Sequence, residues 1–171
     1  AEVYASIRAF FYAREVLEVE TPLLSKSTAT DPFLESIQAD LSVSQSIPIQ
    51  TYFLHTSPEF PMKRLLASGS GAIYQICKTF RNAETGHRHN PEFTMLEWYR
   101  PGFDMNQLMI EVGELVACVL NQPVTSPSKI SYREAFLTFL GIDPFLASES
   151  ELIKLAQDKA GYSANEEDIN V

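Results

Sequence analysis

The sequence predicts an α+β fold, and three observations support this prediction. Apolar residues recur at helical spacing over about 2–14 and again in the second half of the chain. Short stretches with alternating side chains predict strands that follow one another as hairpins. There is no regular alternation of strand and helix. We therefore expect an antiparallel sheet flanked by helices.

The individual elements follow from local signals in chain order. The predicted strands are 16–19, 33–41, 51–56, 72–81 and 92–100. The predicted helices are 2–14, 59–67, 105–120, 132–140 and 149–159. Ser57 is expected to cap the second helix, Pro58 to occupy its first turn, and Gly69 and Gly71 to end it. Asp104 is expected to cap the third helix.

Composition and charge exclude several classes of function. The 171 residues, 45% of them hydrophobic, are enough for one domain with a core. A net charge of -9 disfavours non-specific nucleic-acid binding, because such a surface repels phosphate backbones. No apolar run is long enough to cross a bilayer and we see no export leader, so we expect a cytoplasmic protein without a membrane partner. Cys77 and Cys118 lack metal-type spacing and are interpreted as reduced core thiols.

The hairpin predicted over 72–100 carries the residues that are best suited to binding or catalysis. On its second strand, alternation places these residues on one face: Phe93, Met95, Glu97 and Tyr99. On its first strand, one face holds Gln75, Cys77, Thr79 and Arg81. If the strands pair, Arg81 and Phe93 suit a nucleotide, because a guanidinium binds phosphate and a ring stacks on a base. Periodicity alone favours the alternative, a solvated hairpin with an ion pair between Arg81 and Glu97.

Three strings in order resemble motifs of the class II aminoacyl-tRNA synthetases, in their lysine-type branch. REVLEVETP (14–22) resembles motif 1, the helix–strand element of that family's dimer interface. TSPEF (56–60) resembles its substrate loop, and FRN…GHRHNPEFTMLEWYRP (about 80–100) resembles motif 2. The resemblance implies a partial catalytic domain over 1–171 with an incomplete antiparallel sheet, a helical segment at 105–160, and a homodimer formed through motif 1.

The resemblance also implies roles for single residues. Arg81 matches the catalytic arginine that holds the α-phosphate of ATP, and Phe93 matches the ring that stacks on adenine. The other matches to ATP-binding positions are Asn82, Ala83, His89 and Asn90, and the loop also carries His87 and Arg88. The matches to amino-acid-binding positions are Ser57, Pro58, Glu59, Glu97 and Tyr99. Glu97 and Tyr99 would receive a distal ammonium, and with Glu59 they would select lysine-like substrates.

Within this branch, the string MLEWYRP (95–101) is closer to the members that modify elongation factor P than to true lysyl-tRNA synthetases. The resemblance therefore implies ATP-dependent activation of (R)-β-lysine or lysine as an aminoacyl-adenylate. Transfer to a lysine side chain of elongation factor P would follow, so tRNA is disfavoured as a partner. A true lysyl-tRNA synthetase core and a non-catalytic paralogue remain alternatives. The second gains support from Ala83, where the family has glutamate.

Two further features depart from the family pattern. Motif 1 has glycine where this chain has Glu15, and a left-handed glutamate would cost roughly 1–2 kcal/mol, so we expect a locally adjusted turn. Motif 3, with its second ATP-binding arginine, is not found in the 171 residues, nor are the acidic residues that usually hold Mg²⁺. ATP is thus expected as a substrate whose Mg²⁺ takes its ligands from outside this chain. By itself the chain is expected to be inactive.

Other polar features have structural interpretations. The Gly69-Ser70-Gly71 string lacks the Lys-Ser/Thr of a P-loop and is interpreted as a helix-ending turn. Lys63 and Arg64 are interpreted as a solvated helix face, and His55 as a structural residue. The acidic run at 166–168 is interpreted as a solvated tail, so no residue is assigned to a metal.

Overall fold

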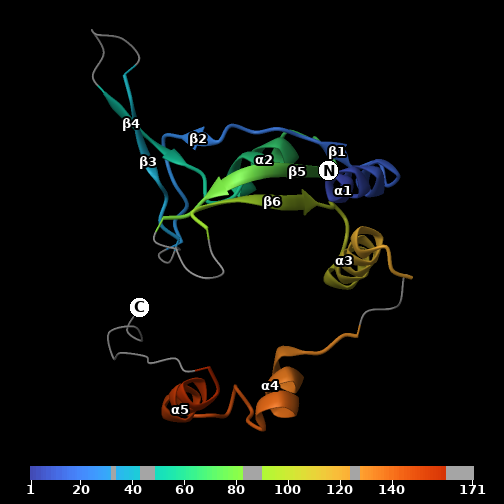
Figure 1. Ribbon diagram of the computed structural model, residues 1–171, viewed down its shortest axis with the longest axis vertical. Coiled ribbons are helices and arrows are strands. Elements are labelled where there is room, and N and C mark those ends of the chain that lie inside the picture. The colour runs from blue at the N-terminus through green and yellow to red at the C-terminus, as the bar shows by residue number, and fades with distance from the viewer. Residues whose placement is uncertain (32–33, 43–48, 83–89, 124–127, 161–171) are drawn as a thin grey trace. The chain divides into compact units, whose positions relative to one another are not determined.

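The computed structural model describes residues 1–31, 34–42, 49–82, 90–123 and 128–160 of the chain. It divides into two compact units, Ala1–Ser126 and Pro127–Val171. Helices combine with small sheets in the first unit (Figure 1), so the predicted α+β class is confirmed. The assignment of all of 1–171 to one catalytic domain stays a prediction.

The first unit contains α1 (Glu2–Tyr12), β1 (Leu17–Glu18), β2 (Leu24–Ser25), β3 (Gln38–Leu41), β4 (Gln50–Leu54), α2 (Glu59–Ala67), β5 (Ile73–Phe80), β6 (Glu92–Tyr99) and α3 (Met105–Leu120). The bounds of α2 and α3 are those predicted. Strand β3 covers only the second part of the predicted 33–41, and β2 was not predicted because two residues carry no period.

The strands form two three-stranded sheets, in the orders β1-β5-β6 and β2-β4-β3. Strands β5 and β6 are antiparallel, with Ile73 opposite Tyr99 and Phe80 opposite Glu92. The expected antiparallel pairing holds for β5 with β6 and within the second sheet, whereas β1 is parallel to β5 and makes the first sheet mixed. Parallel pairing is possible because the chain between β1 and β5 is the long connection that such a pair needs.

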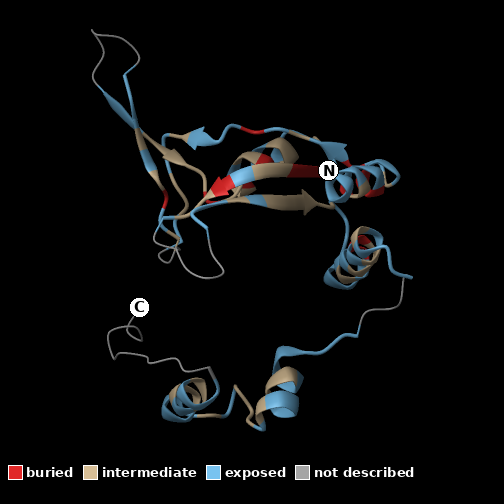
Figure 2. Ribbon diagram, in the orientation of Figure 1, coloured by how far each residue is buried: buried red, intermediate tan, exposed pale blue. Residues whose placement is uncertain are grey.

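The core of the first unit lies between α1, α3 and one face of the β5–β6 hairpin (Figure 2). Its buried members are Ile7, Phe10, Phe11, Val16, Tyr74 and Leu115. Ile76, Leu96 and Trp98 pack against them from the two strands. The even-numbered residues of the hairpin therefore face the core, which leaves the odd-numbered residues on the opposite face.

The start of α2 differs from the prediction, whereas its end and the start of α3 agree with it. Pro58 is itself the N-cap, and Ser57 lies one residue earlier, where its Oγ accepts the Glu59 N–H at 3.2 Å. The predicted cap is thus displaced by one position, although Ser57 still satisfies an N-terminal N–H. Gly69 has a φ of +86°, which confirms the helix-ending turn. Asp104 caps α3 in a capping box.

Two expectations about single residues are wrong. Glu15 has a φ of +54°, so glutamate itself adopts the left-handed conformation that a locally adjusted turn was expected to avoid. Its N–H donates to the Tyr12 carbonyl at 3.1 Å, and burial of the next residue, Val16, holds the turn in place. Cys118 is exposed and Cys77 is only partly buried, although both thiols are free as expected. Cys118 stays outside the core because α3 buries only Glu111 and Leu115.

The second unit contains α4 (Tyr132–Leu140) and α5 (Glu149–Ala160). Ser131 caps α4 in a capping box with Glu134, and Gly141 ends it with a φ of +70°. The Nε of Arg133 donates to Asp143 at 2.8 Å. In neither unit does a described helix combine the length and hydropathy needed to span a membrane.

Candidate active site

The odd-numbered face of the β5–β6 hairpin brings the predicted polar and aromatic residues together. The antiparallel register puts Phe93 opposite Thr79 and Glu97 opposite Gln75. The prediction that these residues share a face is therefore confirmed. Gln75 is 1% exposed, and its Oε1 accepts the Thr21 hydroxyl at 3.0 Å, so motif 1 is tied directly to this face.

At one end of this face, Arg81 and Phe93 lie together. The Arg81 N–H donates to the Pro91 carbonyl at 2.9 Å, which continues the pairing one step beyond the strands. The Arg81 guanidinium carbon lies 5.2 Å from the centroid of the Phe93 ring, within cation–π range. A planar cation and an aromatic face thus stand side by side, the combination expected for binding a phosphate and a base.

The other residues predicted to contact ATP have different surroundings. Asn82 donates its N–H to the Glu35 carbonyl at 2.8 Å and its Nδ2 to the Glu35 carboxylate at 3.0 Å. Here it anchors the end of the hairpin to residue 35, while Asn90 is exposed. Four loop residues lie outside the described residues: Ala83, His87, Arg88 and His89. The ATP contacts proposed for all these positions stay predictions.

At the other end of the face, Tyr99 donates its hydroxyl to Glu97 Oε1 at 2.7 Å. Burial raises the pKa of Glu97, the Tyr99 hydrogen bond opposes this shift, and the charge of Glu59 adds to it. Burial also raises the pKa of the Tyr99 phenol. A partly desolvated carboxylate with a phenol as its hydrogen-bond donor is a suitable acceptor for an ammonium group.

The alternative of an ion pair between Arg81 and Glu97 does not fit the register. Glu97 stands opposite Gln75, which is about 20 Å along an extended strand from position 81. An exposed ion pair between described residues of this hairpin joins Lys78 to Glu92 on the even-numbered side, at 3.2 Å.

The substrate loop borders a pocket of about 170 Å³. The pocket is lined by Pro22, Leu24, Ser25, Ser27, Thr28, Ala29, His55, Thr56, Ser57, Glu59, Phe60, Pro61 and Arg64. Ser57 and Glu59 were predicted to bind the substrate, but the stretch at 22–29 and Arg64 were not. The stretch 22–29 has no helical or strand periodicity in its sequence. Only its position directly after motif 1 could have identified it as part of the pocket.

His55 connects this loop to the hairpin. Its Nε2 lies 2.7 Å from the Lys78 carbonyl oxygen, and its own carbonyl accepts the Phe80 N–H at 3.0 Å. The structural interpretation of His55 is therefore confirmed. Burial raises the pKa of the nearby Cys77 thiol to about 11, so this cysteine is not an activated nucleophile.

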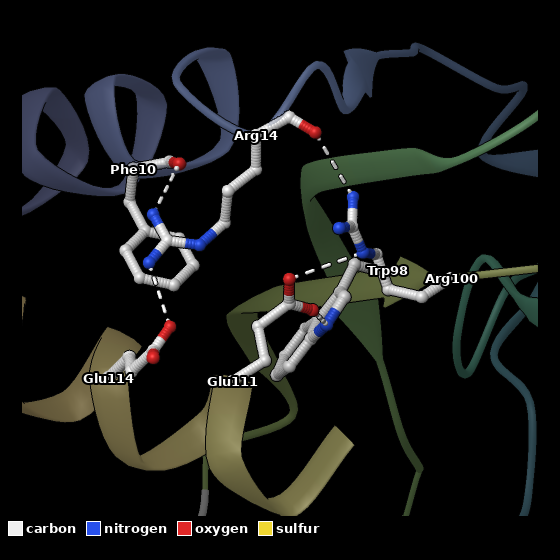
Figure 3. A network of polar contacts seen from close by, with 6 residues as sticks. All are labelled: Phe10, Arg14, Trp98, Arg100, Glu111 and Glu114. Atoms are coloured by element: carbon white, nitrogen blue, oxygen red, sulfur yellow. Dashed lines mark hydrogen bonds and ion pairs between the residues drawn. The ribbon is translucent and has the colours of Figure 1, made fainter. Parts of the chain in front are cut away.

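The even-numbered side holds a separate polar network (Figure 3). Trp98 Nε1 donates to Glu111 Oε2 at 3.0 Å, and Arg100 Nε lies 3.2 Å from Glu111 Oε1. Glu111 is 4% exposed and belongs to α3. The Trp-Tyr-Arg run therefore divides by strand alternation: Tyr99 reaches the candidate site, while Trp98 and Arg100 anchor α3.

Metal ligands are a separate question. Within the ranges that the structure describes, no three His, Cys, Asp or Glu side chains are grouped as they would be around a metal ion. The acidic run at 166–168 lies outside those ranges. The Mg²⁺ that accompanies ATP stays a prediction.

Comparison with known proteins identifies the class. The family model described as tRNA synthetases class II (D, K and N) matches residues 1–159, and the chain belongs to this family. Similar curated proteins are named elongation factor P–(R)-β-lysine ligase. The protein of Avibacterium paragallinarum is 48% identical over 169 residues, which are 98% of this chain and 52% of that protein. The protein of Pseudoalteromonas translucida is 50% identical over 168 residues, 97% of this chain and 51% of its own length.

A third relative carries the same name. The protein of Pectobacterium atrosepticum is 49% identical over 157 residues, 92% of this chain and 48% of that protein. The resemblance inferred from the motifs is confirmed. The chain spans about half the length of the curated relatives that it matches.

Proposed function

We propose that the protein containing this chain activates (R)-β-lysine or lysine with ATP and transfers it to a lysine side chain of elongation factor P in the cytoplasm. The observation that carries the proposal is the arrangement of one face of the β5–β6 hairpin. Arg81 and Phe93 stand together at one end, and the Glu97–Tyr99 pair stands at the other. The names of the relatives support the choice of acceptor.

In the first step, the carboxylate of the amino acid attacks the α-phosphorus of ATP. The bond to the β-phosphate oxygen breaks, and pyrophosphate leaves with the bonding electrons. The Arg81 guanidinium neutralises the charge that develops on the α-phosphoryl oxygens, and Phe93 holds the base by stacking. In the second step, a lysine amine of the acceptor attacks the acyl carbonyl, an amide forms, AMP leaves and the amine proton passes to solvent.

Selection of the amino acid is assigned to the two carboxylates. Glu97 with Tyr99 receives the distal ammonium, and Glu59 receives the amino group near the reacting carboxyl. A neutral amino acid would leave the partly buried Glu97 carboxylate without a countercharge, which disfavours its binding. This charge arrangement supports lysine-like substrates as a class.

The test is amino-acid-dependent exchange of pyrophosphate into ATP by the complete protein that contains this chain, with (R)-β-lysine compared with L-lysine. Arg81→Ala is expected to lower the exchange rate about 100- to 1000-fold, because it removes a transition-state contact. Arg133→Ala, at the exposed arginine paired with Asp143, is the control and should not change the rate. Absence of exchange with both amino acids would overturn the proposal in favour of a non-catalytic paralogue.

A lysyl-tRNA synthetase core is the second candidate, because the family description names tRNA synthetases. The two candidates share the adenylate step and differ in the acceptor. Transfer of labelled amino acid to elongation factor P with no charging of tRNA is the expected result. Charging of tRNA alone would establish the second candidate.

Two properties of the chain itself belong to the proposal. Adenylate formation by the 171 residues alone is expected to be undetectable, because they carry no motif 3 arginine. A homodimer through motif 1 is supported by the exposed Leu17 of β1, which belongs to motif 1, and large hydrophobic residues are also exposed on the preceding helix α1: Val3, Tyr4 and Tyr12. Sedimentation of the complete protein tests the dimer, and a monomer would contradict it.

A further inference from the structure

Lys63 is an exposed residue of α2, and it contacts Glu59 of the substrate loop. Its Nζ is 2.5 Å from Glu59 Oε1, in an i,i+4 pair with glutamate on the N-terminal side. From the sequence, Lys63 was interpreted as part of a solvated helix face rather than as a residue that reaches a substrate. Yet its partner is the carboxylate that lines the pocket beside Ser57.

The charge of Lys63 extends to the second carboxylate of the site. Among the charges that act on Glu97, Glu59 raises its pKa, whereas Lys63 and His55 lower it. One lysine side chain therefore contacts Glu59 and partly compensates Glu97. An alkylammonium group of the protein thus already pairs with one of the two carboxylates that the proposed function assigns to an alkylammonium substrate, and its charge acts on the other.

An exposed i,i+4 pair is usually a minor element of helix stability, and the hairpin offers a comparison. Lys78 and Glu92 form an ion pair with side-chain exposures of 53% and 55%, close to the 55% and 47% of Lys63 and Glu59. That pair lies on the even-numbered side, away from Glu97 and Tyr99. The two pairs thus match in chemistry and exposure and differ in whether a candidate substrate carboxylate takes part.

We propose that Lys63 is a specificity-determining residue: it occupies Glu59 when the site is empty and is displaced by the amino group of the substrate. This inference rests on the proposed function. A ligand must then supply a cation able to replace Lys63, so a compound with no amino group in reach of Glu59 leaves the Lys63 contact unbroken. Lysine-like diamines meet this requirement, because one amino group can replace Lys63 at Glu59 while the distal ammonium binds Glu97.

The test is equilibrium binding of (R)-β-lysine and L-lysine to the complete protein by calorimetry, together with the pyrophosphate-exchange KM and kcat. Lys63→Met keeps the length and packing of the side chain but removes its charge. It is expected to tighten binding about fivefold and to lower KM equally, with kcat unchanged, because one competing unit charge near the site is lost. Lys63→Arg should keep the wild-type affinity, and Lys78→Met should leave both constants unchanged.

A pH series separates this role from a merely structural one. Without the Lys63 charge, the pKa of Glu97 rises, so the pH below which binding is lost should move upward in Lys63→Met and not in Lys78→Met. Unchanged or weaker binding by Lys63→Met, with wild type binding normally, would overturn the inference alone. Absence of binding by wild type would overturn the proposed function and this inference with it.

Discussion

Two glutamates lie on opposite faces of strand β6 and have different partners. Glu97 belongs to the strand, whereas Glu111 belongs to α3 and contacts the strand through Trp98. Glu111, from α3, is 4% exposed and is met by Trp98 Nε1 at 3.0 Å and Arg100 Nε at 3.2 Å. Glu97, on the strand itself, receives the Tyr99 hydroxyl at 2.7 Å, and burial raises its pKa. Strand alternation alone separates the two environments.

The comparison distinguishes a structural carboxylate from one suited to a ligand. Glu111 is neutralised by an arginine of its own chain, which closes the network between β6 and α3 (Figure 3). Glu97 is desolvated, has a neutral phenol as its hydrogen-bond donor, and lies within the field of another carboxylate, Glu59. Stability is therefore expected to depend on the first glutamate and substrate binding on the second.

The largest effect is expected for Glu111→Ala. The change removes the acceptor of Trp98 Nε1 and leaves the largely buried Arg100 guanidinium without its countercharge, which costs about 3 kcal/mol of unfolding free energy. Urea unfolding measures this loss. Glu114→Ala, which breaks the more exposed pair with Arg14, should cost less than about 1 kcal/mol. Equal losses in the two variants would contradict the distinction.

Glu97→Gln should lower activity without lowering stability, the opposite of what is expected for Glu111→Ala. Without the countercharge for the substrate ammonium, kcat/KM for lysine-dependent pyrophosphate exchange should fall about 100-fold. The thermal midpoint should rise, because the raised pKa means that the ionised carboxylate is disfavoured in the fold at neutral pH. A variant that loses stability together with activity would place Glu97 in the structural class.

The pH dependence of substrate affinity and of stability should also identify Glu97 as the substrate carboxylate. Binding needs ionised Glu97, so affinity should fall with decreasing pH through a pKa above the ordinary 4.5. Stability has the reverse sign: protonated Glu97 contributes stability that is complete below about pH 4.5 and is lost as the pH rises through the raised pKa. Tyr99→Phe removes the hydrogen bond that lowers this pKa and should move the KM midpoint to higher pH. An unmoved midpoint would show that another group titrates.

The smallest effect concerns the strained residue at the edge of the structural network. Arg100 donates to the Arg14 carbonyl at 3.3 Å, directly before Glu15 with its φ of +54°. Glu15→Gly should stabilise the fold by about 1 kcal/mol without changing exchange activity. Asn121→Gly, at a φ of +51° that asparagine tolerates, should gain less. Urea unfolding compares them, and equal gains would argue against strain at Glu15.

Local patterns predicted much of the fold and of the hairpin face. Alternation placed Phe93, Glu97 and Tyr99 on one face because the side-chain period of a strand is two. The parallel pairing of β1 with β5 was missed, since it joins segments far apart in sequence and leaves no periodic signal. The left-handed conformation of Glu15 was missed because the buried Val16, rather than local preference, decides it.

The site was predicted less completely than the strand face. The roles of Arg81 and Glu59 came from motif resemblance and not from periodicity, and their chemistry stays a prediction. The contact of Lys63 with Glu59 follows local helix spacing, i to i+4, but the place of this pair beside a pocket lined by 22–29 depends on how a loop packs against α2. Such packing is set by tertiary contacts that a local pattern does not contain.

The register of the β5–β6 hairpin also has a consequence for folding kinetics. Arg81, Phe93 and the Glu97–Tyr99 pair sit on contacts of short sequence separation, and hairpins form within about 1–10 μs. Strand β1 must bring Leu17 to Ile73 across a long connection that contains β2, β3, β4 and α2, so it should dock later. Until it does, the β1-side edge of β5 is open to strands of other chains, and misassociation during synthesis should begin at that edge.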